Sequence, residues 1–220
     1  MLRRSLFIRN IQSDDYLENF LISAVISVFV IRIFLAVTDY PIIGGGNLHI
    51  AHMLWGGFFM LAALITLFSF LSQRTAAVAS VLGGIGFGAF IDELGKFITA
   101  DNNYFFQPTI SLIYIIFVLI FLITRFIPRH HEFSQREYLV NAIEMIKESA
   151  IDDFDEDERR RAEEYLRHCD QRNEMVKALK KMLQNIDVAP TPRPGFFTRI
   201  RRKFRVFYYR VAESDRILTA

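Results

Sequence analysis

Four stretches of the sequence are apolar and long enough to cross a lipid bilayer, which a helix of about 20 residues can span. They cover residues 16–37, 48–71, 76–99 and 109–126. Short polar or turn-forming segments separate them, such as TDYPIIGGGN with its proline and three glycines. The pattern predicts an all-α fold in which residues 16–128 form a four-helix transmembrane bundle, preceded by a basic N-terminal segment, residues 1–15. Ser13 is expected as the N-cap of the first helix.

The residues after the fourth stretch are highly charged and predict a cytosolic helical region, residues 129–188. Ser134 and Glu137 form a capping-box pattern that starts a helix. An acidic run then opens a second amphipathic helix, expected over residues 155–186, although Arg172 and Asn173 interrupt its apolar stripe. The two helices would either pack on each other or form a coiled-coil-like pair between the subunits of a homo-oligomer.

Residues 189–220 combine a Pro-rich hinge, APTPRPG, with a C-terminal basic amphipathic helix. Aromatic and aliphatic residues recur there at helical spacing, and basic residues occupy much of the remainder. This pattern is typical of a helix that lies on a membrane surface. We expect it to bind anionic lipids rather than the acidic residues 152–164 or nucleic acid. The basic residues expected to contact the lipids are Arg199, Arg201, Arg202, Lys203 and Arg205.

The arginines outside the apolar stretches set the expected orientation. The chain has 220 residues, 52% of them hydrophobic, and a formal net charge of +2. Because the two loops on one side contain no Lys or Arg, the positive-inside rule places both termini in the cytosol. No cleavage site follows the first span, so we expect it to remain as an anchor in the cell membrane. The single cysteine, Cys169, excludes an intramolecular disulfide. The arginines that set this orientation are Arg3, Arg4, Arg9, Arg74, Arg125 and Arg129.

The third span carries Asp92, Glu93 and Lys96 within its last two turns. Charges inside a membrane span are costly and by default indicate a functional site. At 1.5 Å per residue, Asp92 lies about 24 Å from the start of this span. The charged residues are therefore expected in the outer third of the bilayer.

Three polar residues of the other spans are expected at the same level: Arg32, His49 and His52. Glycines spaced by four precede Asp92 on its own helix face and would let another helix approach closely. We expect Asp92 to face the histidines and to pair with Lys96 along its helix. Glu93 points in another direction, where Arg32 is its expected partner.

This cluster is compatible with several kinds of site. With Asp92 and Glu93 as acceptors and a histidine that titrates near neutral pH, it would bind or conduct a cation, a proton or a polar ligand. His49, His52 and Asp92 would suit a divalent metal ion, as in a metal-dependent membrane enzyme acting on lipid-linked substrates. The cluster would also suit a lipid head group, or it would be a structural set of ion pairs in a scaffold whose tail recruits partners. No nucleophile with an arranged base stands out, so no catalytic residue is assigned and no other cofactor is expected.

At HIAHMLWGG and GGIGFGAFIDELGKFITADNNYFFQP the chain resembles uncharacterised bacterial four-span membrane proteins and, more distantly, VanZ-like and YjdF-like membrane proteins. The resemblance covers residues 48–107. It implies a histidine near the start of one span, here His49 or His52, and an acidic residue in a Gly-rich span, here Asp92 or Glu93. VanZ-like proteins are associated with resistance to glycopeptide antibiotics, which implies a role in the cell envelope. The IDELGK run and the long charged tail depart from that pattern.

Overall fold

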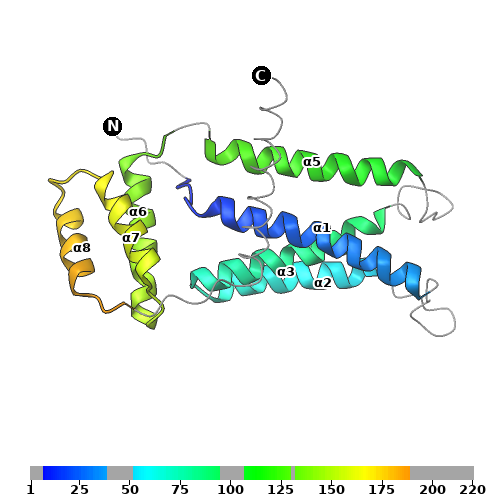
Figure 1. Ribbon diagram of the computed structural model, residues 1–220, viewed down its shortest axis with the longest axis horizontal. Helices are drawn as coiled ribbons and strands as arrows, with labels where there is room; N and C mark the ends of the chain where they lie inside the picture. The colour runs from blue at the N-terminus through cyan, green and yellow to red at the C-terminus, as the bar shows by residue number, and fades with distance from the viewer. Residues whose placement is uncertain (1–6, 39–51, 95–106, 130–131, 189–220) are drawn as a thin grey trace, which may run out of the picture.

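The computed structural model describes residues 7–38, 52–94, 107–129 and 132–188. Within these ranges the chain forms seven α-helices and one 3-10 helix, and no strand. The all-α fold is therefore confirmed for this part of the chain. The long helices form a bundle, and the shorter ones cover one end of it (Figure 1).

The bundle contains α1 (Ser13–Val37), α2 (His52–Ser69), α3 (Gln73–Asp92) and α5 (Gln107–Arg129). The first three are long and apolar enough to cross a membrane, and α5 holds a further apolar stretch, Pro108–Thr124. α3 packs closely against both α1 and α2, whereas α5 lies at the edge of the bundle, next to α1 (Figure 1). Many large apolar side chains on the bundle surface are exposed, which is compatible with a surface that faces lipid.

The helix boundaries correct the expected spans at two places. α1 has Gln12 as its N-cap and Ser13 as its first residue, so the prediction of Ser13 as the cap was wrong; no side-chain cap bond forms there. α3 was expected to continue to Thr99, but it ends at Asp92 with Glu93 as its C-cap. Both acidic residues therefore lie at the end of this helix rather than inside it.

Glycines let α1 and α3, which run parallel, touch backbone to backbone. A Cβ atom at Gly84 would lie 2.3 Å from the carbonyl oxygen of Phe20, and one at Gly88 would lie 2.3 Å from that of Ala24. Any side chain would clash at these positions, and small residues are what allow helices in membranes to approach so closely.

The α2–α3 hairpin is packed in the same way. A Cβ atom at Gly56 would lie 2.7 Å from the carbonyl oxygen of Gly86, and the reciprocal distance is 2.6 Å. Ser72 turns the chain between the two helices and caps α3 by accepting a hydrogen bond from the backbone N–H of Thr75. α3 is thus held by backbone contacts on two sides.

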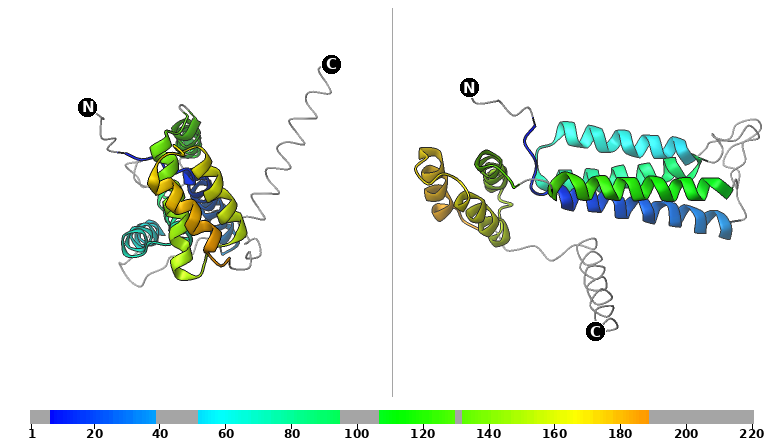
Figure 2. Two further views of the ribbon diagram at one scale, coloured as in Figure 1. Left: turned by 90° about the vertical axis from the view of Figure 1, so that its left-hand side faces the viewer. Right: turned by 90° about the horizontal axis from the view of Figure 1, so that it is seen from above.

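A smaller unit, which we name the helical cap, covers the end of the bundle at which α1 and α3 begin. It consists of α6 (Gln135–Ile146), the 3-10 helix η1 (Lys147–Ile151), α7 (Glu156–Arg167) and α8 (Glu174–Asn185). α6 and α7 lie across the bundle end, and α8 lies beyond them (Figure 2). The core of the cap is formed by large apolar side chains that are at most 1% exposed: Met145, Phe154, Leu166, Val176 and Leu183.

In the cap, one expected helix start is confirmed, and one expected long helix proves to be two helices. Ser134 and Glu137 form the complete capping box. The single helix expected over residues 155–186 is instead two helices, because the chain breaks after Arg167. The side chain of Asn173 caps α8 by accepting from the N–H of Met175. Cys169 lies buried in the break, where burial raises the pKa of its thiol.

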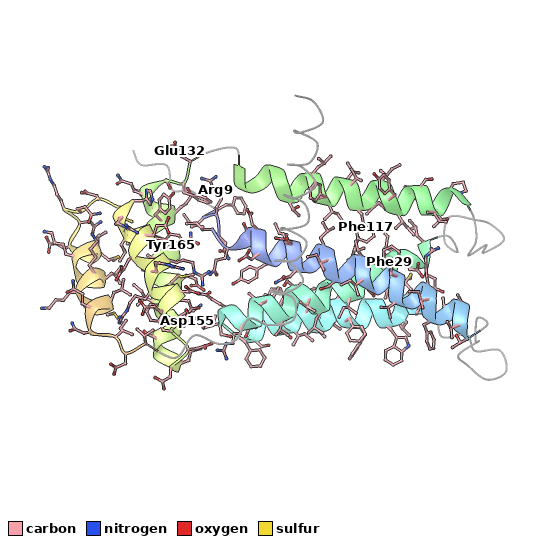
Figure 3. The ribbon with its side chains drawn as sticks, viewed as in Figure 1. Arg9, Phe29, Phe117, Glu132, Asp155 and Tyr165 are labelled. Carbon is pink, nitrogen blue, oxygen red and sulfur yellow. The ribbon has the colours of Figure 1, made fainter. Side chains whose placement is uncertain are left out.

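Polar contacts join the cap to the N-terminal segment and to the turn between α2 and α3. We name this set of contacts the junction. The Arg9 side chain donates from Nε to Oε1 of Glu137 over 2.7 Å and from Nη2 to the carbonyl oxygen of Glu132 over 3.0 Å (Figure 3). Its guanidinium also lies 4.4 Å from the ring centroid of Phe133. Residues 7–10, which belong to the basic N-terminal segment, form no helix.

Two further cap side chains bind the bundle backbone at the junction. Asn141 accepts a hydrogen bond from the N–H of Ile11 and donates one to the carbonyl oxygen of Arg9, each over 2.9 Å. Glu148, which is 1% exposed, accepts from the N–H of Gln73 over 3.0 Å. Because Gln73 is the first residue of α3, this carboxylate satisfies one of the unpaired N–H groups at the helix start and favours its dipole.

Replacing Gly88 with alanine should disrupt the α1–α3 contact. The added methyl group would overlap the backbone of Ala24, and overpacking of this kind costs about 1–3 kcal/mol. Gly57→Ala is the matched control, because nothing lies within 4 Å of a Cβ atom there. Thermal unfolding of the two variants in detergent should show a lower Tm for Gly88→Ala alone; equal Tm values would contradict the packing described.

Acid should release the N-terminal segment from the cap. The hydrogen bond from Arg9 lowers the pKa of Glu137 from 4.5 to about 2, so its stabilisation is present above about pH 4.5 and lost as the pH falls toward 2. A hydrogen bond to a charged group contributes about 1.5–3 kcal/mol. Hydrogen exchange at the Ile11 amide should therefore accelerate over this pH range relative to its intrinsic rate. In Glu137→Gln the Ile11 amide should exchange fast already at pH 6. A wild-type exchange rate in this variant at pH 6 would contradict the role of Glu137 in holding the N-terminal segment.

Candidate polar site at the end of α3

Two carboxylates are buried where α3 ends. The side chains of Asp92 and Glu93 are both 0% exposed. They lie at a helix C-terminus, which carries a partial negative charge and so disfavours further negative charge. Burying them there requires positive charge or hydrogen-bond donors nearby.

Asp92 has one such group from each of the two neighbouring helices. Nε of Arg32, on α1, donates to Oδ1 of Asp92 over 2.7 Å. Nε2 of His52, the first residue of α2, lies 3.3 Å from Oδ2. Each carboxylate oxygen of Asp92 therefore faces a different helix.

Glu93 is bound at the start of α2. Its Oε2 accepts a hydrogen bond from the backbone N–H of Met53 over 2.8 Å. Unpaired N–H groups at a helix N-terminus bind anionic groups well, because the helix dipole adds to the hydrogen bond. The same Oε2 lies 3.7 Å from Nδ1 of His52, so the imidazole has a carboxylate oxygen near each of its nitrogens.

The structure therefore brings together four of the six residues proposed for this site, from three helices. Arg32 and His52 are partly exposed, with 33% and 24% of their side chains accessible, whereas the carboxylates are covered. Arg32 was expected to pair with Glu93, but the ion pair that forms is with Asp92. The reason is that Asp92 continues the α3 face that carries Gly84 and Gly88, and this face packs on α1.

The other predicted site residues lie outside the described part of the chain. These are His49 and Lys96 in the polar site, and the basic residues expected at the membrane surface, Arg199, Arg201, Arg202, Lys203 and Arg205. The pairing of Asp92 with Lys96 and the binding of anionic lipids by the tail stay predictions.

The arrangement has a place for further positive charge between its two carboxylates. Arg32 is a permanent cation beside Asp92, and a proton on His52 would lie between Asp92 and Glu93. An imidazolium donates from both nitrogens, and each nitrogen of His52 has a carboxylate oxygen within 4 Å. A small cation near the imidazole would add positive charge at the same place.

No group of three or more His, Cys, Asp or Glu side chains among the described residues is placed to hold a metal ion. The predicted metal set included His49 besides His52 and Asp92, and His49 is not described. A divalent metal at this site stays a prediction.

Two contacts of the site were missed by reasoning from the sequence. The N–H of Met53 is a backbone donor, and its position depends on where α2 begins. Ser27 donates from its hydroxyl to the carbonyl oxygen of Ile85 over 3.0 Å. This bond joins α1 to α3 at a position that precedes Arg32 along α1. A serine within an apolar span was the only signal that could have indicated this second bond.

Comparisons of the chain with protein-family models, with curated proteins and with solved structures gave no match. The resemblance to VanZ-like and YjdF-like proteins therefore stays a prediction. What the site does must be inferred from its geometry.

Removing Arg32 should destabilise the protein strongly. Arg32→Leu leaves the buried carboxylate of Asp92 without its ion-pair partner, which costs about 3–5 kcal/mol. The double variant Arg32→Leu/Asp92→Asn should recover much of this loss, because the uncompensated charge is then absent. Arg160→Leu, which removes the exposed pair with Asp157, should change little. Unfolding by SDS in mixed micelles measures these differences, and a loss no larger than that of Arg160→Leu would contradict the role of Arg32.

Proposed function

We propose that this protein is a multi-pass membrane protein whose polar site at the end of α3 binds and exchanges a proton or a small cation. The observation that carries the proposal is the position of His52, with its two nitrogens 3.3 and 3.7 Å from two buried carboxylates. Arg32 supplies one positive charge against these two carboxylates. A proton on the imidazole, or a cation beside it, would add positive charge between them.

Three apolar helices of sufficient length, α1, α2 and α3, support the placement in a membrane. We take α5 as the fourth span. The positive-inside rule then places the junction and both termini in the cytosol, because Arg9 and Arg74 lie at the capped end. In this orientation the polar site faces the outer side of the cell membrane.

The exposure of the four side chains supports exchange from that side. His52 and Arg32 are partly exposed, whereas both carboxylates are covered. In this proposal an arriving proton or cation therefore meets His52 or Arg32 before it reaches a carboxylate. Histidine is the side chain that gains and loses a proton most readily near neutral pH. In this proposal His52 carries the proton, and Asp92 and Glu93 hold the charged imidazole.

The cap supports a second function, that of a scaffold. It is a helical unit with its own core, joined to the bundle by the junction, and its outer helix α8 exposes Met175 and Met182. A scaffold that recruits partners through this surface needs no exchange at the polar site. For a metal-dependent enzyme acting on lipid-linked substrates, no contact among the described residues adds support.

Proton flux into liposomes tests the leading proposal. The full-length protein, reconstituted with an enclosed pH-sensitive dye, should carry protons faster than protein-free liposomes. Asp92→Asn should reduce this flux by about tenfold or more, since removing a neighbouring opposite charge changes the affinity of a group for its proton by about that factor. Asp157→Asn, at an exposed position on α7, is the matched control.

The possible results separate the two functions. A flux that falls in Asp92→Asn and persists in Asp157→Asn supports proton exchange. A sodium or potassium gradient that changes the wild-type flux would identify a cation as the competing species. If the wild-type protein carries neither protons nor these cations, the exchange proposal is wrong and the scaffold function is the better account.

A further inference from the structure

The junction and the polar site lie at opposite ends of the same two parallel helices. At the capped end, Asn141 binds the chain just before α1, and Glu148 binds the first N–H of α3. Gln12 and Gln73 also meet there, with 2.9 Å between Nε2 and Oε1. At the other end Arg32 of α1 binds Asp92 of α3.

The two helices have matched lengths between these contacts. Ser13 and Arg32 are 19 positions apart, and so are Gln73 and Asp92. At 1.5 Å per residue both distances are about 28 Å. A single axial position, or register, of α1 along α3 therefore allows the junction contacts and the Arg32–Asp92 ion pair to form together.

The contacts between the two ends resist a change of this register. Gly84 and Gly88 touch the α1 backbone directly, and an axial slide would bring the side chains that flank them on α3 against it. The hydroxyl of Ser27 also binds a backbone carbonyl of α3. Tightly packed interfaces of this kind respond to a displacement as a unit rather than by continuous deformation.

We propose that the helical cap regulates the polar site by setting the register of α1 on α3, with Glu148 and Asn141 as positioning residues. A partner or modification that loosens the cap would thereby weaken the Arg32–Asp92 contact and change exchange at the site. The coupling is reciprocal, so a change at Asp92 alters the stability of the junction in turn. The effect on flux rests on the proposed function. The coupling between the cap and the site is also tested independently by hydrogen exchange.

The test compares Glu148→Ala with Glu148→Gln in the full-length protein. Alanine removes the acceptor for the Gln73 N–H, whereas glutamine keeps an acceptor oxygen of the same reach. Mutations that act on coupling between distant sites change it by about two- to thirtyfold. We expect a loss of proton flux in that range for alanine and a near wild-type flux for glutamine. Glu163→Ala, an exposed position on α7, is the control.

Hydrogen exchange of the same variants in nanodiscs gives the structural readout. Glu148→Ala should accelerate exchange both at residues 73–76, beside the mutation, and at residues 88–92, about 22–28 Å farther along α3. Acceleration confined to residues 73–76, with flux unchanged, would overturn the coupling and leave the proposed function standing. If the wild-type protein shows no flux, the proposed function fails, and exchange at residues 88–92 alone decides the coupling.

A second position keeps the test decisive if Glu148→Ala does not fold. Asn141→Asp keeps an acceptor for the Ile11 N–H but loses the donor to the carbonyl oxygen of Arg9. It should accelerate exchange at residues 88–92 as well. Asn185→Asp on α8, where the amide side chain is exposed and bonds only within its own helix, is its control, and equal exchange in the two variants would overturn the proposal.

Discussion

Two carboxylates are buried at the negative end of an apolar helix, and compensating their charge constrains the rest of the bundle. A buried charge without a partner costs several kcal/mol, more than most single contacts in a protein provide. Asp92 and Glu93 therefore need groups from other helices. α1 supplies the guanidinium of Arg32, and α2 supplies the backbone N–H of Met53 together with the imidazole of His52.

These partners reach the carboxylates only because glycine removes the side chains between the helices. Gly84 and Gly88 bring α1 against α3, and Gly56 and Gly86 bring α2 against its other side. Without the close approach, Arg32 would not reach Asp92 to form its hydrogen bond, and His52 would not lie 3.3 Å from it. The glycine faces and the polar cluster are thus parts of one arrangement, in which packing positions charge.

Much of this could be predicted from the sequence because it depends on local pattern. Apolar stretches indicated the long helices, the Ser134–Glu137 spacing indicated the start of α6, and the four-residue spacing of glycines placed Asp92 on a buried face.

The predictions that failed depended on tertiary geometry. Whether Arg32 meets Asp92 or Glu93 depends on which face of α3 packs on α1 rather than on α2, and the glycine spacing of α3 does not reveal that by itself. A pattern of apolar residues also continues through Glu93, so it did not reveal that α3 ends at Asp92. Asn141 and Glu148 are separated from their partners at the junction by more than 70 residues, and their polar side chains looked like ordinary surface positions.

The most direct test is a density map at side-chain resolution of the full-length protein in a lipid nanodisc. We predict the Arg32 guanidinium within hydrogen-bond distance of Asp92, and the His52 ring between Asp92 and Glu93, with both carboxylates shielded from lipid. A map in which Asp92 faces lipid or bulk water, away from α1, would contradict the central claim that packing positions these charges.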